Sequence, residues 1–318
     1  MLLHLRVTCP TDRSDEVRAL FEADPGTAHL AVVPGGSVVP PGDLFLADVA
    51  REAADGLVRR LRDLHVDRDG GIALESVDTA VSRSAEVAED RAPGDGADAV
   101  VWEQVVRTTA SDSTLSVAYV AFLTIATLLA AVAIVNDSAI LVIGAMVLGP
   151  EFAPIAALAV AVVGGRRSIA RQALVTLVAG FAIAIGVTAL VALLGRVAGW
   201  YGSDLLAADR PATGFITQPD RWSVVVAVLA GIAGVLSLTS AKSGALVGVF
   251  ISVTTVPAAG DIALSLALGD GREVGEAAAQ LGINLVGILL AALATLAVQR
   301  AVWRRVPRVV PDVPRPRR

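Results

Sequence analysis

The sequence predicts an α-helical polytopic membrane bundle of about six spans, with an N-terminal α+β ferredoxin-like soluble domain in front of it. Three observations predict this class. Hydrophobic residues make up 54% of the 318 residues and the mean hydropathy is +0.67, above the range of ordinary soluble domains. The two parts of the chain have opposite net charge: residues 1–115 carry 21 acidic and 11 basic side chains, whereas residues 116–318 carry 10 acidic and 15 basic ones. The apolar residues of the second part fall into stretches long enough to cross a bilayer.

The front domain is predicted from alternating and helical hydrophobic patterns. Leu3, Leu5 and Val7 alternate with polar residues, which is typical of a half-buried strand. Pro34-Gly35-Gly36 is expected to end the second strand. The order β-α-β-β-α-β is that of the ferredoxin-like split unit. The predicted elements after the first strand are a helix at 11–24, strands at 28–33 and 43–49, a helix at 52–66 and a strand at 71–77.

A polar segment separates this domain, assigned to residues 1–81, from the apolar half. Residues 82–98 contain Pro93, Gly94 and Gly96, which predicts a linker. Residues 99–110 then place Trp102 among valines on one helical side, which predicts an interfacial helix with its indole at headgroup level. We assign 82–115 to the linker and interfacial helix, 116–300 to the transmembrane domain and 301–318 to a basic cytoplasmic tail.

The basic residues of the second half alternate in step with the spans. Arginines lie at 166–171 and through 300–318, and Lys242 lies between the fourth and fifth spans. The positive-inside rule therefore predicts that both termini face the cytoplasm, in a multi-pass protein of the cell (inner) membrane. The six predicted spans are 116–135, 139–163, 173–195, 222–240, 244–268 and 277–298.

Composition argues against several kinds of site. Cys9 is the only cysteine, and the three histidines are scattered through the front domain rather than placed at metal-ligand spacing. We expect no metal, no cofactor and no nucleic-acid partner. An intramembrane enzyme is also disfavoured, because the spans offer no paired nucleophile and base.

Spans two and five carry the candidate site, because proline and glycine interrupt both near their middles beside a carboxylic acid, Glu151 or Asp261. Proline removes a backbone donor, and broken backbone at membrane depth survives only inside protein or beside a cavity. The alternatives are two kinks that only fit neighbouring helices, and carboxylic acids kept neutral by burial. The candidate substrate or ion site comprises Asn136, Ser138, Gly149, Pro150, Glu151, Pro154, Ser243, Thr254, Thr255, Pro257, Asp261 and Asn284.

The two halves of the membrane domain match in order, with spans one to three and four to six repeating at a spacing of about 105 residues. Three spans per half insert the second copy upside down, so the sequence predicts a 3+3 inverted repeat. Broken helices at matching positions of such a repeat are typical of a transporter's midplane site.

Three segments carry a family resemblance: NDSAILVIGAMVLGPEFAPI (136–155), SAKSGALVGVFISVTTVPAAGD (240–261) and INLVGILLA (283–291). They resemble the uncharacterised hydrophobic bacterial membrane proteins called domain of unknown function 389. The resemblance covers the membrane half and implies a cytoplasmic ferredoxin-like domain joined to a multi-span domain. An apolar residue usually follows the first proline of the family motif, and Glu151 stands there in this chain.

The leading functional hypothesis is a membrane transporter or channel-like protein for a small solute or ion, regulated through the cytoplasmic domain. The alternative is a membrane-anchored sensor or scaffold that transports nothing. A water-accessible cavity between spans two and five would favour the first, and a solid apolar core the second. The expected partners are the lipid bilayer, a small solute or cation, and further copies of the chain as a homo-oligomer.

Overall fold

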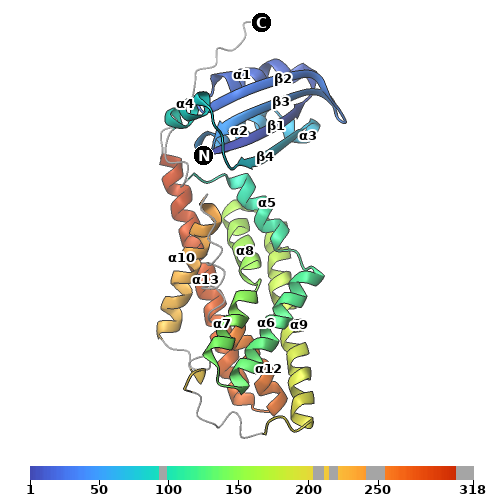
Figure 1. The fold of residues 1–318 in the computed structure, drawn as a ribbon, viewed down its shortest axis with the longest axis vertical. Coiled ribbons are helices and arrows are strands. Elements are labelled where there is room, and N and C mark those ends of the chain that lie inside the picture. Colours follow the sequence, from blue (N-terminus) through green and yellow to red (C-terminus); the bar gives the residue numbers. More distant parts are fainter. Residues whose placement is uncertain (93–98, 203–210, 215–220, 241–254, 306–318) are drawn as a thin grey trace. The chain divides into compact units, whose positions relative to one another are not determined.

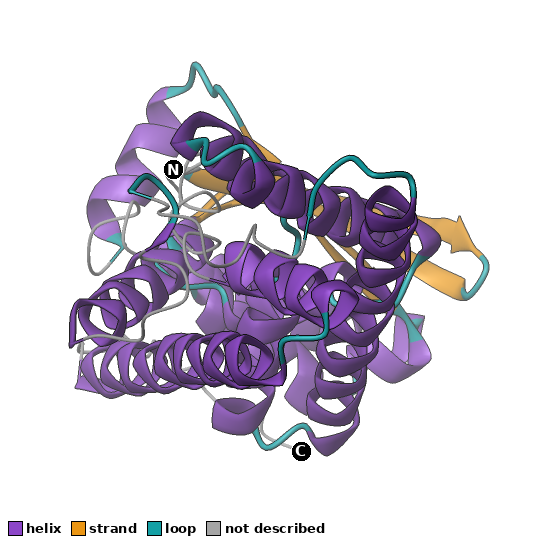
Figure 2. Ribbon diagram, turned by 90° about the horizontal axis from the view of Figure 1, so that it is seen from below, coloured by secondary structure: helices purple, strands orange, loops and turns teal. Residues whose placement is uncertain are grey.

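The computed structural model describes residues 1–92, 99–202, 211–214, 221–240 and 255–305. The chain divides into two compact units, one built mainly on Met1–Val105 and the other on Val106–Leu238 with Ser243–Arg300. Figure 1 labels the elements of both, and Figure 2 distinguishes the strands, in orange, from the helices, in purple. Each unit is described by itself.

The first unit contains a four-stranded antiparallel sheet with the strand order β2-β3-β1-β4. The predicted element order is confirmed, and the sheet order interleaves its two β-α-β halves as the ferredoxin-like arrangement does. The helices are divided more finely than predicted, because a 3-10 turn at Thr11–Arg13 precedes the first helix. The elements are β1 (Leu2–Cys9), α1 (Ser14–Ala23), β2 (Thr27–Val38), β3 (Pro41–Ala50), α2 (Arg51–Asp63), α3 (Val66–Asp69) and β4 (Gly71–Val77).

One face of this sheet forms the core of the unit. Leu5 pairs with Ala47 across β1 and β3, and Val7 pairs with Phe45, so their side chains share that face. Phe21 of α1 stacks on Phe45 with ring centroids 6.2 Å apart. The predicted inward residues Leu57 and Leu61 of α2 are fully buried in the same cluster. The alternation of polar and apolar residues in β1 thus separates the covered face from the outer face, where His4 and Arg6 lie.

The second strand is longer than predicted. Pro34-Gly35-Gly36 does not end it, because β2 continues to Val38 with a register shift between Val33 and Ser37. Gly35 has a φ of 64°, which costs a glycine little, so the chain bulges here and then resumes pairing. The Gly35 amide donates to the Asp43 carboxylate over 2.7 Å. Hydrogen bonds from the Ser14 hydroxyl and from this amide hold the pKa of Asp43 below its ordinary value.

The segment predicted as a linker contains a helix. Residues Arg83–Arg91 form α4, which packs against β2 and β3 through the buried Ala85 and Ala88. Two alanines three positions apart give this polar segment one flat apolar side, which is enough to dock it on a sheet. Pro93, Gly94 and Gly96 lie outside the described residues.

The segment predicted as interfacial begins on the front domain instead. In α5 (Trp102–Asp112), the Trp102 amide donates to the Asp55 carboxylate over 3.2 Å, and Glu103 pairs with Arg62 at 2.8 Å. Val101, just before the helix, is buried in the core of the first unit. The first turn of α5 is therefore held by α2, and the boundary between the two units falls inside the helix at Val105.

The second unit is helical in its described residues. Four of its helices are long and apolar enough to cross a membrane, and α7 with α8 makes a fifth if that bent pair is one span. The fifth predicted span, 244–268, is represented by α12 alone, whose described residues are too few to cross, while residues 244–254 lie outside the described part. The helices are α6 (Val117–Val135), α7 (Ala139–Leu148), α8 (Phe152–Gly164), α9 (Arg167–Val197), α10 (Arg221–Thr239), α12 (Thr255–Leu268) and α13 (Gly271–Arg305).

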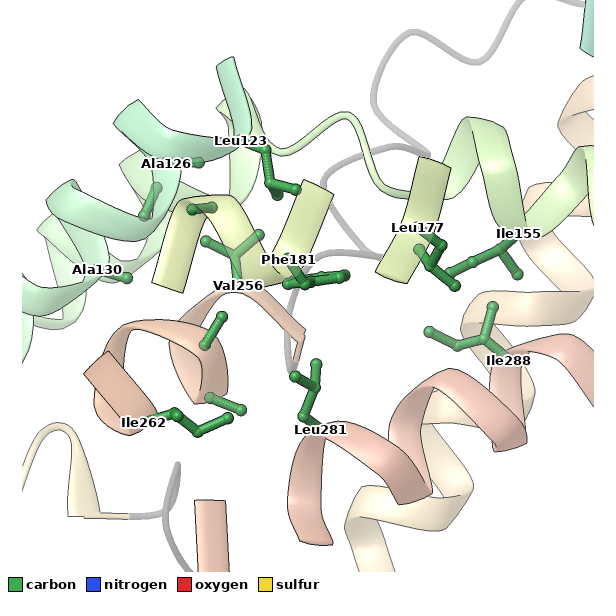
Figure 3. Close-up of a cluster of buried hydrophobic side chains, with 14 of the residues drawn as sticks. Leu123, Ala126, Ala130, Ile155, Leu177, Phe181, Val256, Ile262, Leu281 and Ile288 are labelled. Atoms are coloured by element: carbon green, nitrogen blue, oxygen red, sulfur yellow. The ribbon is translucent and has the colours of Figure 1, made fainter. Parts of the chain in front are cut away.

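Small residues let these helices approach closely around an apolar core, which Figure 3 shows between α6, α8, α9, α12 and α13. A Cβ atom on Gly260 of α12 would lie only 2.8 Å from the Cβ atom of Ala130 on α6. By contrast, the outward side chains of α9 are large and apolar, and Val178, Leu190 and Leu194 are each more than half exposed. An apolar surface of this kind suits lipid better than water.

Contacts between helix ends define two opposite ends of the second unit. At one end, Arg300 of α13 donates to the Val163 carbonyl near the end of α8. At the other, Arg196 of α9 donates to the Ala267 carbonyl of α12 over 2.9 Å. The end of α6 belongs to this second end as well, because Ala133 and Ile134 pack in one buried cluster with Ala192 of α9 and Ala267 of α12. In the turn that follows α6, the Asp137 carboxylate accepts a hydrogen bond from the Thr213 hydroxyl over 2.8 Å. We call them the Arg300 end and the Asp137 end.

Candidate functional site

The break between α7 and α8 is the most irregular feature of the described membrane helices. The two helices are bent by 49° across Gly149, Pro150 and Glu151. Pro150 cannot donate a backbone hydrogen bond, so α7 cannot continue through it as regular helix. Pro154 is buried in the first turn of α8, where a missing N–H costs nothing because that position has no intrahelical partner. The predicted interruption of span two is thus present at the predicted residues.

Glu151 stands at the N-cap of α8 and is fully buried. Its side chain does not cap its own helix but accepts a hydrogen bond from the Thr255 hydroxyl, with 2.6 Å between Thr255 Oγ1 and Glu151 Oε1. Thr255 is the first residue of α12 and is fully buried too. One hydrogen bond therefore joins the break of span two to the start of the described part of span five.

The ends of two helices meet at this carboxyl group. α8 begins there, and the N-terminus of a helix carries partial positive charge. α7 ends two residues before Pro150, and its C-terminal carbonyls contribute the opposite sign. Glu151 is thus surrounded by fixed backbone dipoles rather than by hydrocarbon alone.

The depth of Glu151 follows from the helix lengths. α7 runs from the Asp137 end to the break over ten residues, and α8 continues over thirteen residues toward the Arg300 end. At 1.5 Å per residue these are about 15 Å and about 20 Å. α12 leads from Thr255 back to the Asp137 end over fourteen residues, or about 21 Å. Glu151 therefore lies near the middle of the unit's length, and α12 runs antiparallel to α7.

α12 is enclosed by protein on nearly every side. Twelve of its fourteen residues are buried, among them Pro257 and Asp261, and it packs mainly against α6 and α9. Asp261 lies six residues beyond Thr255, about 9 Å further along the helix axis. A helix that is apolar and covered all round is typical of the centre of a bundle. The two carboxylic acids predicted from the sequence are therefore both inside the helical unit, at neighbouring levels.

Three buried hydroxyl groups that were not predicted as site residues lie on the helices of this unit. Tyr119 of α6 is close enough to Glu151 for an electrostatic interaction, and its ring packs on Gly180 of α9. Ser265 follows Asp261 by one helical turn and is fully buried. Thr188, which is also fully buried, lies on α9. Within the described part of the chain, the hydroxyls of Tyr119, Thr188 and Ser265 have no hydrogen-bond partner.

A second buried polar contact lies between α10 and α13. The Gln280 amide donates to the Ser223 hydroxyl over 3.0 Å, with both residues buried. Asn284, one of the predicted site residues, is fully buried one turn further along α13. A polar amide side chain inside an apolar stretch is the signal that could have identified Gln280.

Two predicted site residues lie away from Glu151. Ser138 caps α7 by accepting from the Leu141 amide over 3.4 Å, and the Asn136 amide donates to the Val132 carbonyl over 2.8 Å. Both belong to the turn at the Asp137 end, about 15 Å along α7 from the break. Their observed contacts are those of helix ends. Two further predicted residues, Ser243 and Thr254, lie outside the described residues.

Comparison with known proteins agrees with the resemblance noted from the sequence motifs. Residues 146–290, which span the break, α12 and most of α13, match the model of a family described as "Domain of unknown function (DUF389)". The chain is also 27% identical over 194 residues to "Uncharacterized protein MJ0678" of Methanocaldococcus jannaschii. That alignment covers 61% of this chain and 58% of the relative, so the chain spans less than two thirds of the relative's length. No solved structure matches.

Proposed function

We propose, from the premise that residues 146–290 form a domain of this family, that the chain is a membrane transporter or channel-like protein for a small solute or ion. The observation that carries the proposal is the buried hydrogen bond between Thr255 and Glu151. It joins a broken helix to a short enclosed helix at mid-depth, which is the arrangement found at the binding sites of secondary transporters.

The chemistry of the site favours a cation, a proton or an amine over an anion. An ionised carboxylate shielded from water is costly unless it is paired, and an anion would add a second negative charge beside Glu151. Glu151 already occupies the place at the N-terminus of α8 where an anion would bind. Exchange of a proton or a small cation at this carboxylate changes the charge of the site without disturbing the surrounding backbone.

The buried hydroxyls are suitable ligands for such a species. Hydroxyl and carbonyl oxygens coordinate hard cations, and a hydroxyl oxygen accepts a hydrogen bond from the N–H group of a protonated amine. The Tyr119 and Ser265 hydroxyls have no partner in the described part of the chain, so both can still accept a bond. The proposal keeps the predicted inverted repeat, in which one half rocks against the other around a fixed site. The break in span two supports it, whereas α12 runs unbroken from Thr255 to Leu268.

The proposal includes a location and partners. The contact between Arg300 and the Val163 carbonyl supports grouping the basic residues at 166–171 with those beyond Arg300 on one side of the membrane. By the positive-inside rule that side is the cytoplasm, which gives a multi-pass protein of the cell membrane with both termini inside. Its partners are lipid, the transported species and further copies of the chain. It requires no cofactor, and its membrane domain performs no enzymatic reaction.

Flux through proteoliposomes tests the proposal. The purified chain is reconstituted with a dye inside that responds to H⁺, Na⁺ or K⁺, and a gradient of the matching ion is imposed in turn. We expect flux above that of empty liposomes for at least one of these ions, and loss of at least nine tenths of it in Glu151→Gln. Glu276→Gln is the matched control, because Glu276 forms an exposed pair with Arg272. Wild-type flux equal to that of empty liposomes for all three ions would favour a scaffold or sensor instead.

A further inference from the structure

Three strands bring two histidines to one aspartate on the outer face of the front-domain sheet. His4 of β1 pairs directly with Asp48 of β3 in the strand register, so their side chains share a face. His4 Nδ1 lies 2.8 Å from Asp48 Oδ1, and His29 Nδ1 of β2 lies 2.8 Å from Asp48 Oδ2. His4 and His29 are far apart in the sequence, and the pairing of the strands brings them together.

His29 reaches Asp48 through a backbone irregularity. Ala28 is the residue of β2 that pairs with Asp48, and in a regular strand the next side chain would point to the opposite face. The register shifts between Ala28 and Ala31, and His29 has a φ of 49°. Bulges of this kind re-aim a side chain, and a left-handed backbone is uncommon for a residue other than glycine.

The other ring nitrogen of His29 contacts two serine hydroxyls at the start of α4. His29 Nε2 lies 2.7 Å from both Ser82 Oγ and Ser84 Oγ, and these two oxygens are 2.8 Å apart. A carboxylate only accepts hydrogen bonds, so the proton between His29 and ionised Asp48 belongs to Nδ1. Nε2 is then left with a lone pair that accepts from a serine hydroxyl. This is the alignment of nucleophile, base and orienting carboxylate known from serine hydrolases.

Ser82 is the better placed of the two hydroxyls. It is the N-cap of α4, yet its side chain makes no cap hydrogen bond and instead contacts His29. Ser82 directly precedes the first turn of α4, and the first amides of a helix have no intrahelical acceptor. Backbone amides at such a place stabilise the negative charge that develops on an attacked carbonyl oxygen.

We propose that Ser82, His29 and Asp48 form a nucleophilic serine site that takes acyl groups from carboxylic esters. The Ser82 oxygen attacks the ester carbonyl while its proton passes to His29 Nε2. The bond from the carbonyl carbon to the alcohol oxygen then breaks, and the leaving alcohol takes that proton from His29. Water releases the acyl group as a carboxylic acid by the same two proton transfers. Asp48 remains ionised and holds the ring in the required tautomer.

The site faces solvent directly, since the His29 side chain is 40% exposed. It therefore suits a small ester or an acyl group on a flexible carrier, rather than a substrate that must be enclosed. This activity is separate from transport through the membrane unit. The competing explanation is that the same contacts only hold α4 on the sheet, in which case the Ser82 hydroxyl is inert.

A fluorophosphonate probe tests the proposal on the full chain in detergent. The Ser82 oxygen forms a bond to phosphorus, the phosphorus–fluorine bond breaks, fluoride leaves and the proton passes to His29. We expect phosphonylation at Ser82, identified by mass spectrometry of its peptide. In His29→Asn the labelling rate should fall at least about 100-fold, which is the lower range for loss of a general base.

His65→Asn is the matched control, because His65 also has a left-handed backbone, with a φ of 60°, whereas its ring lies 3.3 Å from the Arg62 carbonyl rather than beside a carboxylate and a serine. Asparagine tolerates this backbone, so both variants should keep the circular dichroism of the parent. Ser76→Ala controls for loss of an ordinary exposed serine and should label at Ser82 as the parent does. The proposal is overturned if Ser82 stays unlabelled while a known serine hydrolase in the same tube reacts fully. Equal labelling of His29→Asn and parent overturns it too.

Discussion

Glu151 and Thr255 show what a sequence can reveal at the scale of single residues. A carboxylic acid between two prolines in an apolar stretch is conspicuous, and Thr255 lies beside the matching interruption. Both are fully buried, and their side chains meet at 2.6 Å. Tyr119 and Thr188 could not be chosen in the same way, because a hydroxyl inside an apolar span is common and becomes informative only when its neighbours are known.

The contribution of the Thr255 hydroxyl can be measured directly. Thr255→Val keeps the shape but removes the donor to a buried carboxyl group, so we expect a loss of about 1–3 kcal/mol in the free energy of unfolding. Thr255→Ser retains the donor and should lose less than half as much. Thermal unfolding of the detergent-solubilised variants provides the comparison. If valine and serine destabilise the chain equally, the hydrogen bond contributes nothing measurable.

A larger residue in place of Gly260 should clash with α6, against which α12 packs. An alanine Cβ there would meet the Ala130 Cβ at 2.8 Å and the Ala131 amide nitrogen at 3.0 Å, so backbone has to move. We expect Gly260→Ala to lower the free energy of unfolding by about 1–3 kcal/mol, the usual cost of overpacking. Gly282→Ala is the control, since a Cβ there meets nothing within 4 Å. It should be neutral or slightly stabilising, and equal melting temperatures for the two variants would contradict the packing.

Elements with a clear hydrophobic period were predictable, and those shaped by tertiary contacts were not. The strands of the front domain follow from alternation, and α6 follows from its length and composition. α4 was missed because two buried alanines give almost no signal in a polar segment. The end of β2 was misplaced because Gly35 serves a bulge as well as it serves a turn. Both α9 and α12 are apolar in composition, so the sequence did not predict that protein encloses α12 whereas α9 exposes large apolar side chains.

Residues just before and at the start of α5 contact the front domain, which predicts that this domain extends into α5. Val101 is fully buried in its core, Arg51 donates to the Ala99 carbonyl over 2.8 Å, and Arg62 pairs with Glu103. A fragment of residues 1–112 should therefore give a mixed α/β circular dichroism spectrum and one cooperative melt. A fragment of residues 1–92 should melt several degrees lower, because it lacks these contacts. An all-helical spectrum, or equal melting temperatures, would show that the domain is built differently.

At the scale of the whole molecule, the distribution of charge predicts orientation. α9 ends at the Asp137 end, opposite the Arg300 end that carries the basic residues, and Ser203 follows α9 by six positions in the sequence. In a Cys9→Ala background, a cysteine introduced as Ser203→Cys should react with a membrane-impermeant thiol reagent added outside intact cells. If the cysteine reacts only after the membrane has been permeabilised, the topology is the reverse of the one predicted, and the front domain lies outside the cell.

Transport requires that water reach the buried site during the functional cycle, whereas a scaffold keeps that site dry. The most direct measurement is therefore the reaction of Ser265→Cys, in the Cys9→Ala background, with a small water-soluble methanethiosulfonate reagent in native membranes. Ser265 is fully buried, one turn beyond Asp261, so its thiol can react only if the helices around α12 open to water. Our account predicts slow but complete modification in membranes, and slower modification in the presence of the ion that the chain carries. No modification in membranes, together with full modification after denaturation, would contradict it.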